Sequence, residues 1–213
     1  MSGNRAGLVA EARRIDHAVY DAVSSSNTPR LDRAFAALTQ AADYSRLSIA
    51  AAALLALTGG PRGRLAAVYG LGALAVTATV ANAIVKPMTH RDRPDRHRPA
   101  AEVASSSVPM PKSSSFPSGH SAAAFAFATG VGHVWPLAAV PLSVQATAVA
   151  YSRVHAGVHY PSDVLVGALL GVALGLTTNQ VLDLFGMASA KRAWIASADS
   201  PRSGAGGTAP LLA

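Results

Sequence analysis

Residues 116–120 place a proline, a serine, a glycine and a histidine directly before an apolar run. Ser118 is a residue type that favours a helix N-cap, and Gly119 allows the backbone to approach a ligand closely. A helix that begins here directs unpaired N–H groups and the positive end of its dipole outward, which favours an anion such as phosphate. His120 lies at the mouth of such a site. Alone, the same pattern would also suit an ordinary capped helix with a surface histidine.

A second group of chemically active residue types falls within residues 152–163. Arg153, His159 and Asp163 lie beside apolar segments, where charged side chains are costly and therefore usually functional. Asp163 follows His159 by four positions, so the two side chains can face each other if a helix starts there. A histidine oriented by a carboxylate serves both nucleophilic and acid–base catalysis.

A third group, residues 86–94, contains Lys86 and Arg93 and would, alone, be interpreted as the solvated basic flank of an apolar segment. Together with Arg153, these cations can hold the non-bridging oxygens of a phosphoryl group, and the arginines can do so with two hydrogen bonds each. The two histidines can then divide the roles of nucleophile and proton donor. Because three fixed cations neutralise the phosphoryl charge, we expect no metal ion and no other cofactor.

The overall composition indicates which elements carry these residues. The chain of 213 residues is 50% hydrophobic and only 14% charged, and its mean hydropathy of +0.29 is high for a soluble protein. The net charge is +7, and it accompanies long apolar blocks. We therefore expect a membrane protein whose partner is anionic lipid or a phosphorylated substrate rather than nucleic acid. The chain has no cysteine, which excludes disulfides and thiolate metal sites.

Five apolar segments are long enough, or nearly so, to cross a bilayer as helices. They are residues 47–57, 65–85, 122–134, 137–151 and 164–184. We therefore predict an all-α protein that forms a multi-span transmembrane helical bundle of about five spans. The count becomes six if the N-terminal stretch also crosses the membrane. The alternating directions of the spans would bring the three polar groups to one membrane face. The spacing of Gly167, Gly171 and Gly175 predicts close contact between helices.

The parts of the chain outside the spans have their own patterns. Residues 1–42 have a helical period broken by charges, which predicts one or two amphipathic helices at the membrane interface or a soluble extension. We expect residues 43–186 to form the membrane domain and residues 187–213 to form a flexible tail. Thirteen of the eighteen Lys and Arg residues fall on the catalytic side, which favours the cytoplasm by the positive-inside rule. A further span within residues 8–42 would weaken that bias and leave the side open.

Taken in order, the three groups resemble the complete signature of the type 2 phosphatidic acid phosphatase superfamily. The matching residues are Lys86, six residues, Arg93-Pro94; then Pro117-Ser118-Gly119-His120; then Ser152-Arg153, five residues, His159, three residues, Asp163. Three spaced motifs in this order are far more specific than any one of them. The resemblance covers residues 50–184 and implies a metal-independent lipid phosphate phosphatase of the cell membrane. Membrane members of the superfamily commonly have six spans.

The resemblance also implies a role for each signature residue. His159 attacks phosphorus to give a phosphohistidine, Asp163 raises its nucleophilicity, and His120 protonates the leaving alcohol. The phosphate is bound by Lys86, Arg93, Ser118, Gly119 and Arg153, with Ser152 and Pro117 in support. The implied substrates are phosphatidic acid, phosphatidylglycerol phosphate, a polyprenyl phosphate or diphosphate, or a polyprenyl-phosphoryl sugar phosphate. The Ala- and Arg-rich composition resembles actinobacterial members, for which prenyl-linked substrates of cell-wall synthesis are plausible.

Other interpretations of the same residues stay open. Vanadate-dependent haloperoxidases hold vanadate in a similar site, although those are soluble helical proteins. A protein of this fold could also bind lipid phosphates without catalysis, which the loss of a histidine or of the carboxylate would have indicated. The basic loop 91–98 could contact nucleic acid, but it has no interleaved aromatic residues. A metal cluster of His90, Asp92 and His97 lacks a recognised ligand pattern. We expect these histidines, and His155, to be loop or supporting residues.

Overall fold

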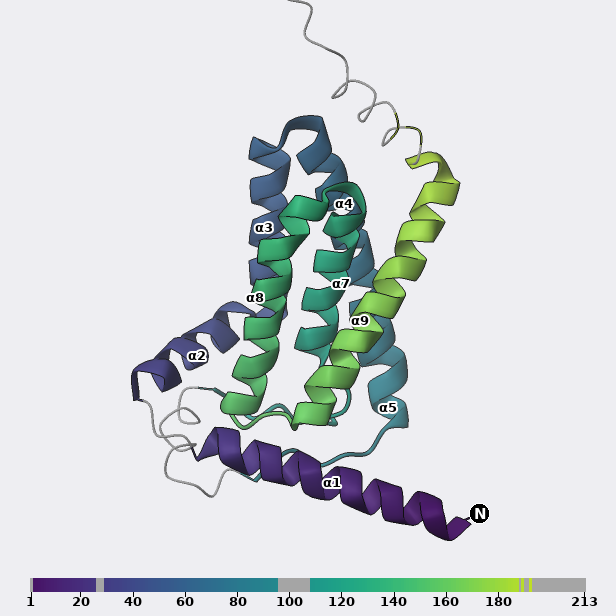
Figure 1. Ribbon diagram of the computed structural model, residues 1–213. Coiled ribbons are helices and arrows are strands. Elements are labelled where there is room, and N and C mark those ends of the chain that lie inside the picture. Colours follow the sequence, from purple (N-terminus) through teal and green to yellow (C-terminus); the bar gives the residue numbers. More distant parts are fainter. Residues whose placement is uncertain (1, 26–28, 96–107, 188, 190–191, 193–213) are drawn as a thin grey trace, which may run out of the picture.

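The computed structural model describes residues 2–25, 29–95 and 108–187, together with Ser189 and Arg192. Within those residues the regular secondary structure is entirely helical, as predicted (Figure 1). The N-terminal part comprises α1 (Ser2–Ser24), α2 (Pro29–Ala41), the 3₁₀ turn η1 (Asp43–Ser45) and α3 (Arg46–Thr58). The rest comprises α4 (Gly60–Thr79), the π-helical segment η2 (Val80–Val85), α5 (Lys86–Met88), α7 (Gly119–Val134), α8 (Pro136–His155), α9 (Pro161–Leu182) and the π-helical segment η3 (Asp183–Met187).

The helix boundaries follow the breakers in the sequence. Ser118 caps α7, while Pro136 and Pro161 stand at the start of α8 and α9, where proline has no intrahelical N–H bond to lose. The start of α7, the end of α8 and the start of α9 consequently meet at one end of the bundle (Figure 1). The tail predicted for residues 187–213 falls outside the described residues, apart from its first residue and the two single positions given above.

Helix α7 is the centre of the bundle and packs against α4, α8 and α9 (Figure 1). More than half of its buried residues are alanine or glycine, and small residues let helix backbones approach closely. A Cβ atom added at Gly171 would lie 2.2 Å from the carbonyl oxygen of Ala122. One added at Gly167 would lie 2.5 Å from the carbonyl oxygen of Ser118. The predicted close contact of the glycine-rich helix is therefore confirmed, and its partner is α7.

Large apolar side chains lie on the outside of the bundle. Leu54 of α3, Val140 of α8 and Leu169 of α9 expose 62%, 62% and 61% of their surface. Lipid tails are as apolar as these side chains, so such a perimeter suits a bilayer. Among the described residues, two helical stretches are long and apolar enough to cross a membrane, Gly60–Met88 and Pro161–Gly186. Helices α3, α7 and α8 do not reach the same combination of length and hydropathy, so the count of five spans stays a prediction.

The two N-terminal helices lie at the edge of the bundle. Helix α1 crosses the end of the bundle where α8 ends and α9 begins, and α2 packs beside α8 (Figure 1). Their inward faces include buried carboxylates beside apolar residues, since Asp16 and Asp32 are only 6% and 3% exposed and Tyr20 and Ala36 are buried too. The apolar side chains of Ile15 and Leu31 face outward instead and are 57% and 51% exposed. An exposed apolar stripe on a helix that crosses a bundle end suits an interfacial position.

Candidate active site

The start of α7 is fixed by Ser118, which is buried and caps the helix. Its Oγ accepts hydrogen bonds from the backbone N–H of Ser121 (3.4 Å) and from the Ser121 hydroxyl (3.0 Å). Its own N–H donates to the carbonyl of Asp163 (2.9 Å), which joins the start of α7 to the start of α9. A Cβ atom on Gly119 would lie only 3.3 Å from Lys86 Nζ. The glycine therefore lets the ammonium group lie against the helix terminus, where an anion is favoured.

The loop between α8 and α9 folds His159 back against the end of α8. Gly157 adopts φ +67°, the left-handed conformation that ends many helices and that glycine accepts most easily. Its N–H donates to the carbonyl of Val154 (2.9 Å). The N–H groups of Val158 and His159 both donate to the carbonyl of Arg153 (3.1 and 3.3 Å). Arg153 and His159 are brought together in this way, and each is only 2% exposed.

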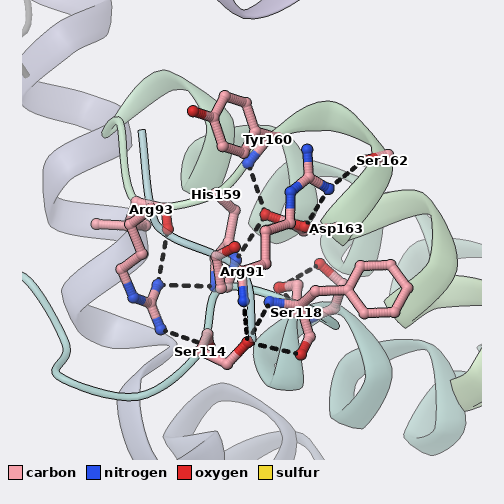
Figure 2. Close-up of polar contacts among 12 residues, drawn as sticks. Arg91, Arg93, Ser114, Ser118, His159, Tyr160, Ser162 and Asp163 are labelled. Carbon is pink, nitrogen blue, oxygen red and sulfur yellow. Dashed lines mark hydrogen bonds and ion pairs between the residues drawn. The ribbon is translucent and has the colours of Figure 1, made fainter. Parts of the chain in front are cut away.

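His159 lies between a carboxylate and a guanidinium group (Figure 2). Its Nδ1 is 3.5 Å from Oδ2 of Asp163, and its Nε2 is 3.5 Å from Nη1 of Arg93. Asp163 is fully buried, and its Oδ2 also accepts the backbone N–H of Tyr160 (2.9 Å). The expected contact over four positions forms, but not along a helix. Helix α9 begins only at Pro161, and His159 reaches the carboxylate from the preceding loop.

The surroundings of His159 keep its imidazole neutral. Burial lowers the pKa of His159 most, and the positive charges of Arg153 and Arg93 lower it further, while Asp163 only partly opposes them. The resulting pKa is about 4, against an ordinary value of 6.5. A neutral imidazole has the lone pair that a nucleophile needs, so His159 can attack at neutral pH.

Arg93 is held in place by backbone carbonyls from two segments. Its Nη1 donates to Val158 (2.7 Å), its Nε to Ser113 (3.1 Å) and its Nη2 to Ser114 (3.2 Å). These bonds fix the plane of the guanidinium group beside His159 (Figure 2). A fixed guanidinium plane suits two parallel hydrogen bonds to the oxygens of one phosphate.

A cavity of about 470 Å³ opens beside these residues, a size within the usual range for small-molecule sites. Four of the predicted site residues line it: Lys86, Gly119, His120 and Arg153. The remaining wall comes from turn η1, from Asn82 of η2, from the segment before α7, and from Ala78 of α4 and Ala123 of α7. The predicted catalytic and phosphate-binding residues thus meet at one end of the bundle, where Arg93 lines a second cavity that shares Lys86 with the first.

Two residues near the catalytic carboxylate, Arg91 and Asp16, are not among the site residues predicted from the sequence. Arg91 donates to Oδ1 of Asp163 (2.8 Å) and to the hydroxyl of Ser162 (2.6 Å), and it forms an ion pair with Asp16 of α1. Burial raises the pKa of Asp16, but hydrogen bonds from Ser162 and Arg91 outweigh it and hold the pKa below its ordinary value. Arg91 lies between the signature residues Lys86 and Arg93 in the sequence, and this position marks it as a candidate. No sequence feature marks Asp16, because its partners are 75 and 146 positions away.

A third unpredicted group, Asp43 of turn η1, touches the candidate proton donor. Its Oδ1 is 2.9 Å from Nε2 of His120 and 3.6 Å from Nη1 of Arg153. Nothing in the local sequence marks this aspartate, because it lies 77 positions before His120 and outside all three signature segments.

Ser152 and His155 lie outside the cavity and hold α8 against α2. The Ser152 hydroxyl is 2.7 Å from that of Thr39, and His155 Nε2 is 2.8 Å from Oδ1 of Asp32. Among the described residues, no three His, Cys, Asp or Glu side chains are grouped closely enough to hold a metal ion. His97, a member of the metal cluster considered above, lies outside those residues.

Two curated relatives have similar sequences. They are the decaprenylphosphoryl-5-phosphoribose phosphatases of two Mycobacterium tuberculosis strains, CDC 1551 / Oshkosh and ATCC 25618 / H37Rv. Each is 38% identical to this chain over 114 residues. The matched region is 52% of this chain and 58% of each relative, so little more than half of the relatives' length is compared.

Two solved structures have a similar fold. Aquifex aeolicus LpxE superposes with a TM-score of 0.61 at 26% identity, over 76% of this chain and 93% of that one. A transmembrane PAP2 type phosphatidylglycerolphosphate phosphatase from Bacillus subtilis superposes with a TM-score of 0.59 at 24% identity, over 81% of this chain and 87% of that one. The family model described as the PAP2 superfamily matches residues 66–186, more than half of the chain and every signature residue. The chain therefore belongs to the PAP2 superfamily.

Proposed function

We propose that this protein is a membrane phosphatase that hydrolyses the phosphate monoester of a lipid without a metal ion. The observation that carries the proposal is a buried, neutral His159 paired with Asp163 beside a cavity lined by His120, Lys86 and Arg153. His159 is neutral and can attack, while His120 lines the cavity, where it can reach the leaving oxygen, and Lys86 and Arg153 line the same cavity. This combination suits phosphoryl transfer.

In the proposed reaction, Nε2 of His159 attacks phosphorus while the bond from phosphorus to the lipid oxygen breaks. His120 gives its proton to that oxygen, and the lipid alcohol leaves. Water then attacks the phosphohistidine, His120 takes the proton of the water, and inorganic phosphate leaves. Asp163 stabilises the positive charge that develops on His159. The phosphoryl oxygens are held by Lys86, Arg93, Arg153 and the N–H group of Gly119, while Ser118, whose N–H is bonded to the carbonyl of Asp163, caps the helix that presents it.

A prenyl-linked sugar phosphate is the proposed substrate class. The Mycobacterium tuberculosis relatives are named as phosphatases of decaprenylphosphoryl-5-phosphoribose, and they support this choice over the matched 58% of their length. The cavity is larger than a phosphate needs, and Ser45 and Asn82 on its outer wall could bond sugar hydroxyls. The competing substrates are phosphatidic acid, phosphatidylglycerol phosphate and a polyprenyl phosphate or diphosphate.

Helices α3, α4, α7, α8 and α9 are the proposed spans of a multi-pass protein of the cell membrane. The apolar perimeter and the two stretches that are long enough to cross support this topology. Helix α1 crosses the catalytic end of the bundle, which argues against a sixth span in the N-terminal stretch (Figure 1). The excess of Lys and Arg at this end favours its placement on the cytoplasmic side.

Phosphate release from the purified protein in detergent, with EDTA present, tests the proposal. The panel contains decaprenylphosphoryl-5-phosphoribose, decaprenyl phosphate, phosphatidic acid and phosphatidylglycerol phosphate. We expect release from the sugar phosphate lipid by the wild type and none by His159→Ala. Release from a different lipid alone would change the substrate class. No release from any lipid, or release that requires a divalent ion, would overturn the mechanism.

A further inference from the structure

The turn between α2 and α3 has an unusual backbone. Tyr44 and Ser45 adopt φ values of +55° and +58°, a left-handed conformation that is uncommon for residues other than glycine. Consecutive residues in this conformation cost energy and are often kept at functional sites. Asp43 precedes them and lines the cavity, while Tyr44 is 84% exposed at its edge. The turn therefore delivers a carboxylate to the phosphate site from a part of the chain that lies outside the family match.

The Asp43 carboxylate meets the proton-donor candidate directly. Its Oδ1 is 2.9 Å from Nε2 of His120, a normal hydrogen-bond distance, and 3.6 Å from Nη1 of Arg153. His159 has a comparable partner in Asp163, which approaches its Nδ1. Each of the two candidate catalytic histidines is thus paired with one carboxylate through one ring nitrogen.

His120 needs such a partner because of the charges around it. Burial disfavours its protonated form most, and four cationic or titratable groups nearby add to that effect: Arg153 of α8, His159 of the α8–α9 loop, Lys86 of α5 and Arg93 of the following loop. Positive neighbours disfavour the protonated imidazole, yet a proton donor must carry its proton when the substrate arrives. Asp43 is the acidic side chain that contacts His120 and can offset them. The doubly charged substrate phosphate would add to its effect.

We propose, on the basis of the phosphatase function above, that Asp43 is the positioning residue of the proton donor. Its carboxylate accepts the Nε2–H of His120 and holds the ring in one tautomer, so that Nδ1 transfers the proton. When the bond from phosphorus to the lipid oxygen breaks, the Nδ1 proton moves to that oxygen. When water attacks the phosphohistidine, Nδ1 takes a proton from the water and the imidazolium is restored. Asp43 stays ionised throughout, and the net reaction is ester plus water to alcohol plus phosphate.

The test compares Asp43→Asn and Asp43→Glu with the wild type on two substrates. The lipid that the wild type hydrolyses best has a poor leaving group, whereas p-nitrophenyl phosphate has a good one that needs little protonation. With Asp43→Asn we expect kcat for the lipid to fall on the order of 10- to 100-fold and kcat for p-nitrophenyl phosphate to change less than about threefold. The alkaline limb of kcat should move to lower pH, and Asp43→Glu should recover part of the lipid activity.

Asp183→Asn is the matched control. Asp183 Oδ2 lies 3.0 Å from His133 Nε2 at the other end of the bundle, and this pair is about as exposed as the pair of Asp43 and His120. The control removes a similar pair far from the cavity, and it also alters the hydrogen bond that the Tyr69 hydroxyl donates to Asp183. We expect it to leave the ratio of the two activities unchanged. A shift of that ratio in the control would mean that general loss of structure produces the effect.

Other roles for Asp43 would give different results and would overturn the proposal. If the carboxylate only blocks the empty anion site, Asp43→Asn should raise activity on both substrates. If it binds sugar hydroxyls, KM should rise for decaprenylphosphoryl-5-phosphoribose but not for phosphatidic acid. Equal loss on both substrates with an unchanged pH profile would indicate a structural role alone.

A spectroscopic measurement separates this inference from the proposed function. In ¹⁵N-histidine-labelled protein, at a pH where the His120 ring is neutral and with its signals identified by their absence in His120→Gln, we expect the Nε2–H tautomer in the wild type and its loss in Asp43→Asn. That result is independent of turnover, so it decides the role of Asp43 even if no substrate is hydrolysed. A tautomer unaffected by the substitution would refute the proposal while the phosphatase function stood.

Discussion

The protonation of His159 sets the acid limit of the proposed reaction at the scale of a single residue. Its pKa of about 4 means that the attacking nitrogen should stay neutral until the pH falls to that value. Arg93→Gln removes a positive charge whose Nη1 lies 3.5 Å from Nε2 of His159, so the acid limb of kcat/KM should move to higher pH. The rate itself should also fall on the order of 100-fold, because a phosphate-binding group is lost. The measurement is kcat/KM against pH on p-nitrophenyl phosphate.

The same substrate is used for both proteins, so its own ionisation cancels in the comparison. A limb that stays in place, or moves to lower pH, would show that Arg93 does not hold His159 neutral. The free energy of unfolding of the wild type should also depend on pH through His159. The unfolded histidine takes up a proton near pH 6.5 and the folded one only near 4, so native stability falls as the pH falls between those values.

At the scale of an element, α1 is predicted to be part of the catalytic machinery although it lies outside the family match. Asp16 is 6% exposed and joins α1 to Arg91, which in turn bonds Oδ1 of Asp163. Asp16→Asn leaves Arg91 half-buried without its ion-pair partner on α1. We expect stability to fall by about 3 kcal/mol and kcat to fall more than KM changes, because Asp163 is less well held. Thermal unfolding in detergent and steady-state kinetics measure the two effects.

Glu11→Gln supplies a control on the same helix. Glu11 is 63% exposed, and in the described part of the chain its side chain pairs with the exposed Arg14 at 3.7 Å, so the substitution should change neither stability nor kcat. If Asp16→Asn behaved like this control, the contacts that join α1 to Asp163 through Arg91 would contribute nothing to stability or catalysis.

The contact between α7 and α9 is expected to tolerate no added atom at Gly171. A Cβ atom there would lie 2.2 Å from the backbone carbonyl of Ala122, which cannot move without shifting a helix. Gly171→Ala should therefore destabilise the protein by about 1–3 kcal/mol and reduce activity, since the two helices also share the bond from Ser118 to Asp163. Gly72→Ala is the control. Its Cβ would meet the ends of the Leu182 and Thr178 side chains at 3.4 and 3.9 Å, which are ordinary contacts, so helix propensity should dominate and stability should hold or rise.

Sequence patterns predicted the helices and much of the site because those features depend on local order. Apolar blocks specify the bundle helices, Ser118 specifies a cap, and three glycines at a spacing of four specify a close helix contact. Asp16 and Asp43 could not be predicted, because each contacts the site over more than 70 positions. The burial of aspartates on the inward faces of α1 and α2 could not be predicted for a similar reason. From the sequence alone, an aspartate on an amphipathic helix is assigned to the solvent-exposed face, because its buried partner is not known.

At the scale of the whole molecule, charged and apolar side chains occupy different places: the charges of the site lie at one end of the bundle, and exposed apolar side chains lie around its sides. Small residues occupy more than half of the buried positions of α7, with Tyr69 and Phe127 buried among them, and many other large apolar residues face outward. The cations of the site gather at one end, where α1 crosses. A lipid substrate could therefore present its phosphate to that end while its chain stays among the tails. The cost of the buried charges is confined to the place where they can act.

A charge introduced on the perimeter tests this arrangement. Leu169 is 61% exposed near the middle of α9, and in water Leu169→Lys would be close to neutral. In a bilayer the same change places an ammonium group among lipid tails and should cost about 3 kcal/mol of insertion free energy. Leu184→Lys is the control, because Leu184 is 86% exposed at the far end of the helix, where a lysine can reach the interface. The amount of protein recovered in the membrane fraction and its unfolding temperature in nanodiscs should fall for Leu169→Lys and hold for Leu184→Lys. Equal behaviour of the two variants would mean that α9 does not span the membrane as proposed, because only a bilayer makes the depth of the charge along the helix matter.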